Sequence, residues 1–420
     1  MDLRSIVSVS AVVLAAGGCG SRDDVINLGS GWVGTVTTDG NVTTVINESG
    51  SVWGGAATLV EELSIGVEVG DDAYMFGAIR GVAADDSRIY VLDSQVPALR
   101  VYDHEGTHLF DIGGEGQGPG EFDRPDGLAL GPDGRLYVRV FYAQRVNVYE
   151  PEGTSVAPLL PVSGGVRMYQ NGVLQVMPDG IVYTRGRDAF IGLAPDGSEI
   201  PPIRYPQSDE EPLEFRTVST AEFPTPSVMR VPFSPFGVHA LSPSGAFISG
   251  FSSRYRFEVE FRDGQKTVIE RRVEPVLINA REKEWHEGFL RESLRDAGRP
   301  EGPVPSLPDD KPFFSRFVAS HDGLVWVIRP GPGEEQEDCA PFGMGSPELR
   351  LQPCWRDARL VDVFQFDGGR YLGELRVPAG LVLNPDPHIE GDRVVGVFQD
   401  DTGTIKVKRF QLVVPGGERR

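Results

Sequence analysis

Short apolar segments alternate with tight turns along most of the chain, and they recur at a nearly constant interval. Ile89–Asp93 and Leu136–Val140 are both apolar runs of strand length. Three pairs of residues in matching positions lie 47 residues apart: Tyr90 and Tyr137, Tyr102 and Tyr149, and Gly106 and Gly153. Three landmarks at one interval indicate an internal repeat.

A well-preserved unit of this repeat contains four strand-like segments. An apolar run, Gly127–Leu130, is followed by the turn Gly131–Gly134, where a proline presets φ and a glycine accepts a positive φ. The other three segments are Arg135–Val140, Arg145–Glu150 and Thr154–Leu160. Four short strands in a period of about 45 residues are typical of one β-propeller blade.

Weaker copies of the unit continue toward the C-terminus. They are marked by turns and strands at Met177–Gly180, Ser242–Gly245, His321–Gly323, Val394–Phe398 and Ile405–Leu412. The last copy lacks its outer strand, but Thr58–Gly66 aligns with Thr107–Gly113 of the best-preserved part. We therefore predict that this N-terminal strand closes the last blade, which removes open sheet edges.

The length of the repeat region sets the number of blades. Two insertions, at about 274–311 and 331–359, interrupt the region 58–415, and the remainder holds about six units. We predict an all-β fold, a six-bladed β-propeller with one short helical insertion. Asn279 and Glu282 form a capping-box pattern before an apolar stripe, so the helix is expected from Asn279 to Gly298. It is either a lid or docking element over one face, or an insertion packed on a blade edge.

Composition and charge agree with this fold and exclude some functions. The 52 Gly and 33 Pro residues supply many turns, and 40% hydrophobic residues are enough for a packed core. The formal net charge of −21 repels phosphate backbones, so we expect no nucleic-acid partner.

The N-terminal sequence is typical of an export signal. The apolar run Ile6–Ala16 is too short to span a bilayer, and 1–18 suits a signal peptide. The small residues before Cys19 resemble the lipobox of bacterial lipoproteins, which implies lipidation of Cys19 and anchoring at the outer membrane or periplasmic face. The alternatives are ordinary secretion, with cleavage near Ala15–Gly17, and a cytosolic protein. Residues 19–57 are then a tether, with Val42–Ile46 as an extra strand.

The other two cysteines agree with export. Cys339 and Cys354 lie 15 residues apart in the second insertion, and an oxidising compartment allows them to pair. We predict a structural disulfide that contributes about 3 kcal/mol by closing a loop of this size.

One stretch of the repeat also resembles a known family. Gly113–Phe122 with Arg124–Pro125, and the later strand Gln144–Tyr149, resemble the NHL repeat over about 65 to 160. With its lipobox, the whole chain is similar to the six-bladed propeller lipoproteins of environmental bacteria, within the TolB-like propeller superfamily. The resemblance implies the fold and says little about activity.

Six polar residues are expected at the mouth of the central channel, because each stands near the start of a blade's innermost strand. They are Arg80, Asp126, Asn171, His239, Arg316 and His388. Such a ring could bind an anionic or sugar-like ligand through Arg80 and Arg316. The competing interpretation is that polar side chains simply suit a water-filled channel.

No catalytic pattern stands out, since neither Gly-x-Ser-x-Gly nor His-Glu-x-x-His occurs. We expect a non-enzymatic, cofactor-free binding scaffold at the bacterial cell envelope, a monomer that binds an envelope protein, peptide or glycan. The alternative is a metal-dependent hydrolase or lyase that resembles lactonases. It would hold Ca²⁺ in the channel through Asp126, Asn171 and Asp386.

Overall fold

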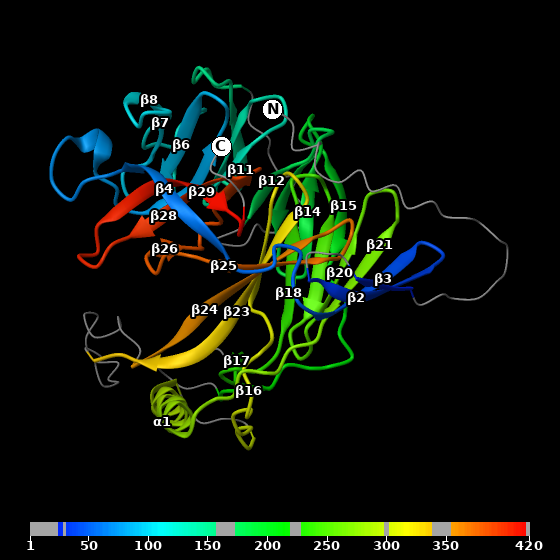
Figure 1. The fold of residues 1–420 in the computed structure, drawn as a ribbon. Helices are drawn as coiled ribbons and strands as arrows, with labels where there is room; N and C mark the ends of the chain where they lie inside the picture. Colours follow the sequence, from blue (N-terminus) through cyan, green and yellow to red (C-terminus); the bar gives the residue numbers. More distant parts are fainter. Residues whose placement is uncertain are drawn as a thin grey trace, which may run out of the picture.

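Six blades form a β-propeller in the computed structural model (Figure 1), and blades 5 and 6 share one nine-stranded sheet. The structure describes residues 24–27, 31–156, 173–218, 228–297, 302–337 and 354–416. Cys19 and Cys339 lie outside the described residues, whereas Cys354 forms a disulfide bond. No helix in the described ranges is both long and apolar enough to cross a membrane.

The first three blades follow one another along the chain from the inner strand outward. Blade 1 comprises β5 (Ile79–Ala84), β6 (Arg88–Asp93), β7 (Ala98–Asp103) and β8 (His108–Ile112). Blade 2 comprises β9 (Pro125–Leu130), β10 (Leu136–Val140) and β11 (Arg145–Tyr149). Blade 3 comprises β12 (Leu174–Val176), β13 (Val182–Arg185), β14 (Ala189–Leu193) and β15 (Glu199–Arg204). A 3₁₀ turn at Asp72–Tyr74 precedes blade 1.

The last three blades complete the ring. Blade 4 comprises β18 (Gly237–Leu241), β19 (Phe247–Phe251), β20 (Arg256–Glu260) and β21 (Lys266–Arg271). Blade 5 comprises β22 (Arg316–Ala319), β23 (Leu324–Glu335), β24 (Trp355–Gln365) and β25 (Tyr371–Arg376). Blade 6 comprises β26 (Leu381–Val382), β27 (His388–Glu390), β28 (Arg393–Gln399), β29 (Ile405–Val413) and, from the N-terminal region, β4 (Ala57–Ile65).

The predicted closure of the ring is confirmed. β4 pairs antiparallel with β29, with Ile65 opposite Val407 and Thr58 opposite Val413. The outer edge of blade 6 is therefore covered by a strand that precedes blade 1 in the sequence. The start of β4 also pairs with β25, so the same strand connects blades 5 and 6.

The N-terminal segment is more than the predicted tether. β2 (Val33–Asp39) and β3 (Val42–Ser49), with β1 (Asp24–Asn27) beside them, extend blade 4 through parallel pairing of β3 with β21. Buried Asn47 accepts hydrogen bonds from Trp32 Nε1 and the Tyr371 amide, at 2.8 and 2.7 Å. Its side-chain amide donates to the carbonyls of Glu270 and Gly369. The hairpin is thus hydrogen-bonded to both blade 4 and blade 5.

Most of the core lies between neighbouring blades, where apolar side chains interdigitate. The interface of blades 4 and 5 is the largest of these clusters and is rich in aromatic rings. Phe257 of blade 4 contacts Phe317 and Phe364 of blade 5, with ring centroids 5.1 and 5.4 Å apart. Aromatic pairs of this kind stabilise an interface beyond their burial alone.

Three insertions form a second, smaller layer, which we call the insertion layer. It contains β16 (Glu214–Arg216), β17 (Val228–Arg230), α1 (Ala280–Ala297) and the far ends of β23 and β24, which lie together in Figure 1. Its own core is formed by Phe215, Val231, Leu290 and Leu307. The predicted helix is confirmed, because the Glu282 amide donates to Asn279 Oδ1 at 3.0 Å.

The insertion layer lies at the end of the propeller where the inner strands begin. The chain enters β18 from β17, and it enters β22 from the segment that follows α1. In the β22–β23 pair, Arg316 is opposite Ile328, so β23 continues past the start of β22. The layer therefore stands beside the channel mouth.

Candidate functional site

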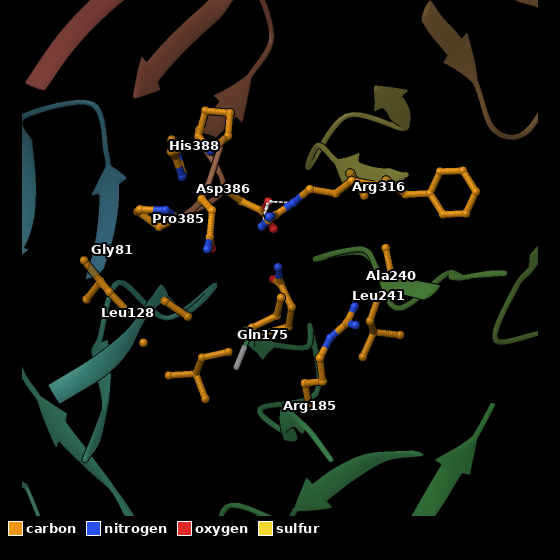
Figure 2. A pocket seen from close by; sticks show the side chains of 18 of the residues that line it. Gly81, Leu128, Gln175, Arg185, Ala240, Leu241, Arg316, Pro385, Asp386 and His388 are labelled. Atoms are coloured by element: carbon orange, nitrogen blue, oxygen red, sulfur yellow. Dashed lines mark hydrogen bonds and ion pairs between the residues drawn. The ribbon is translucent and has the colours of Figure 1, made fainter. Parts of the chain in front are cut away.

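The central channel contains a cavity of about 360 Å³, lined by the inner strands of all six blades (Figure 2). This volume is at the lower end of the range for small-molecule sites. Five of the six predicted mouth residues line it: Arg80, Asp126, His239, Arg316 and His388. The sixth, Asn171, lies outside the described residues.

Close packing of blades 1 and 2 positions Arg80. The next residue, Gly81, is so near blade 2 that a Cβ built on it would lie 2.5 Å from Leu128 Cβ. Glycine is therefore the residue type that this contact requires. Arg80 itself is exposed, and its Nε donates to Ser94 Oγ at 3.1 Å.

Arg316 and Asp386 form an ion pair in the cavity. Arg316 Nε and Nη2 both donate to Asp386 Oδ1, at 2.9 and 2.6 Å. Burial raises the pKa of Asp386 above its ordinary value, although Arg316 acts in the opposite direction. A single carboxylate oxygen thus accepts from the Nε–Nη2 edge of the Arg316 guanidinium.

Asp126 forms an ion pair with a buried arginine. Arg139, which is fully buried, donates from Nε and Nη2 to the two carboxylate oxygens of Asp126, at 2.8 and 2.5 Å. Its Nη1 donates to Thr184 Oγ1 on blade 3. The bidentate pair lies within blade 2, the Thr184 hydrogen bond connects it to blade 3, and we assign Asp126 a structural role.

Arg185 is the main channel residue that sequence reasoning missed. It ends β13, the second strand of blade 3, and its Nη2 donates to the His239 carbonyl of blade 4. Its Nε is buried without a hydrogen-bond partner among the described residues. Figure 2 shows Arg185, Gln175 and Arg316 directed toward the same space. A signal existed, because Arg185 lies 46 residues after Arg139, the interval of the repeat.

Positive charge predominates in the cavity of this acidic protein. Arg316 is paired with Asp386, but no carboxylate among the described residues forms an ion pair with Arg80 or Arg185. Unpaired guanidinium groups in a partly enclosed site favour a negatively charged ligand, because desolvation strengthens the attraction.

Three histidines also line the cavity. His239 stacks on Tyr205 with ring centroids 4.3 Å apart, and burial lowers its pKa to about 4. His321 and His388 lie with ring centroids 5.6 Å apart. Burial, followed by the charge of His388, lowers the pKa of His321.

Replacing His239 with Phe is expected to reduce the acid sensitivity of the fold. In the folded chain His239 stays neutral down to about pH 4, whereas an unfolded histidine takes up a proton near pH 6.5. The unfolded state therefore gains protons first as the pH falls from 7 to 4, which destabilises the native state. Phe keeps the stacking on Tyr205 and cannot titrate. Melting temperatures at pH 7 and pH 4.5 test this, and a pH dependence identical to that of the natural chain would contradict it.

The described residues do not suit a resident divalent metal. They contain no group of three or more His, Cys, Asp or Glu side chains placed to hold one. Of the candidate ligands, Asp126 is held by Arg139 and Asp386 by Arg316. We therefore derive no reaction step through a channel metal.

A family model and one solved structure agree with the fold. A family model described as a 6-bladed beta-propeller (DUF5128) matches residues 69–157. No curated protein matches the sequence. A solved member of the DUF4221 family from Bacteroides vulgatus is similar at 11% identity and a TM-score of 0.50, over 85% of this chain and 99% of that one. Virginiamycin B lyase from Staphylococcus aureus is similar at 10% identity and a TM-score of 0.39, over 83% and 98% of the two chains.

Proposed function

We propose that this protein is a non-enzymatic binding protein that takes up a small organic anion at the mouth of its propeller channel. The observation that carries the proposal is Arg185, whose Nε is buried and has no hydrogen-bond partner in the described part of the chain, near the Arg316–Asp386 pair. Arginine presents several N–H groups in a fixed plane, which matches the two oxygens of a carboxylate or phosphate.

The surroundings of Arg185 supply both binding and selectivity. Arg316 approaches from blade 5 and Gln175 from blade 3, so donors reach the central space from different sides (Figure 2). Asp386 keeps Arg316 oriented and limits the positive charge, so the site favours anions of low charge. The acidic remainder of the protein repels large polyanions.

The N-terminal sequence supports a place at the cell envelope. The apolar run Ile6–Ala16 followed by Cys19 resembles a lipoprotein signal. We propose that the propeller acts outside the cytoplasm, attached through Cys19. Radiolabelled palmitate should enter the natural protein in bacteria and should be absent from Cys19→Ala.

Replacing Arg185 with Gln is expected to weaken binding of acetate and inorganic phosphate at least tenfold. A hydrogen bond to a charged group contributes about 1.5–3 kcal/mol, which corresponds to roughly 10- to 100-fold in affinity. Isothermal titration calorimetry on the purified protein measures the effect.

Arg187→Gln is the matched control for this experiment. Arg187 is two residues away, exposed and outside the cavity lining, so the same substitution should leave the affinity unchanged. Equal affinities in the natural chain and both variants would overturn the proposed channel site.

A further inference from the structure

A second cavity adjoins the channel on the side of the insertion layer. It has a volume of about 390 Å³ and shares the lining residues Phe236 and Ser315 with the channel. We call it the side groove. The apolar part of its lining includes Phe233, Phe236, Pro232, Pro312, Pro330 and Ala358. Phenylalanine rings and prolines thus line a cavity that adjoins the channel at Phe236 and Ser315.

The charged residues of the side groove are largely engaged with the protein itself. Asp357 accepts from Lys311 Nζ at 2.5 Å, and Arg329 donates to Asp362 at 3.2 Å. Arg359 donates to the Leu381 carbonyl, and Arg230 lies over the Phe236 ring at 4.4 Å. Most of the remaining lining is therefore apolar, and exposed Arg230, Asp357 and Arg359 mark the rim of the groove. The hydrocarbon or aromatic part of an anionic ligand could pack against this surface.

We propose that the side groove is the subsite for the apolar part of the channel ligand, which is then an amphiphilic carboxylate of small-molecule size. The inference rests on the proposed function, because it places the carboxylate at Arg185 and Arg316. Because Phe236 and Ser315 line both spaces, the two are adjacent, and the proposal places one molecule across them. A short anion such as acetate would leave the groove unused, whereas an acyl or arylalkyl chain would bury its surface there.

A series of straight-chain acids tests this inference. Acetate, butyrate, hexanoate and octanoate present the same carboxylate with increasing apolar length. We expect affinity to increase about fourfold for each added methylene that enters the groove. Octan-1-ol, which carries the octyl chain without the anion, should bind at least tenfold more weakly than octanoate. Calorimetry on the purified protein measures each dissociation constant.

Two variants locate the chain of the acid. Ala358→Trp fills the groove from β24 and should remove the dependence on chain length while acetate still binds. Arg356→Trp is its control, because Arg356 is exposed on the same strand and does not line the groove. Should Ala358→Trp fail to fold, Arg230→Glu at the exposed rim should weaken octanoate at least fivefold more than acetate.

The outcomes separate the two proposals. If all the acids bind with the same affinity and still require Arg185, the proposed subsite in the side groove is wrong and the proposed channel site still stands. If affinity still depends on chain length to the same extent in Ala358→Trp or Arg230→Glu, the proposed subsite in the side groove is also wrong. If neither acetate nor octanoate binds, the proposed function fails as well.

Discussion

Replacing Lys311 with Met is expected to lower the free energy of unfolding by about 3–5 kcal/mol. The Lys311 side chain is fully buried, and its Nζ donates to Glu282 Oε1 at 2.6 Å, Asp357 Oδ1 at 2.5 Å and the Gly331 carbonyl at 3.1 Å. Glu282 is also fully buried. Met has a similar length but no charge, so it leaves the Glu282 carboxylate buried without its cation. Urea denaturation followed by tryptophan fluorescence measures the loss.

Two further variants test the cause. Lys283, the residue after Glu282 on α1, forms an exposed ion pair with Asp309. Lys283→Met removes a lysine of the same kind there and should lower the free energy of unfolding by less than about 1 kcal/mol. The double variant Lys311→Met with Glu282→Gln removes both buried charges and should regain most of the stability. If Lys311→Met and Lys283→Met are equally stable, the buried ion pair does not hold α1 to blade 5.

The fold could be predicted because its signals are local and repeated. Each blade carries its own turns and apolar runs, so pairs such as Tyr90 and Tyr137, with two others at the same interval, indicate the period. Closure by β4 followed from the same interval, and the pairing of Ile65 with Val407 agrees with it. The insertion layer carries no repeat. Its ion pair joins Glu282 to Lys311, 29 residues apart, and no pattern in the sequence connects them.

The candidate site could be predicted only in part. Residues at the start of inner strands face the channel for a topological reason, which is why Arg80 and Arg316 were found. The sequence did not show which of these charged side chains form ion pairs, because each pair depends on the side chain that the neighbouring strand presents. Asp126 is held by Arg139, whereas Arg185, at the equivalent position of the repeat, forms no ion pair with a carboxylate of the described residues, and we propose it as a ligand contact.

Replacing Asp362 with Ala is expected to destabilise the interface of blades 4 and 5 by about 3–5 kcal/mol. Asp362 on β24 is buried and accepts from Arg329 at 3.2 Å, and from Arg271 on β21. It also accepts from the Tyr255 and Tyr371 hydroxyls at 2.6 and 3.1 Å. Ala leaves two guanidinium groups and two hydroxyls without their common acceptor, and each buried polar group then lacks compensation for its lost hydration.

Charge and hydrogen bonding at Asp362 can be separated by comparing Ala with Asn. Asp362→Asn keeps the shape of the side chain and one of its two acceptor oxygens and removes the charge, so we expect a loss smaller than that of Ala. The matched control is Asp401→Ala, an exposed turn residue that should change stability by less than about 0.5 kcal/mol. Urea denaturation compares all three variants. Equal stability of Asp362→Ala and Asp401→Ala would show that the aromatic contacts of Phe257 with Phe317 and Phe364 hold these blades together without the shared carboxylate.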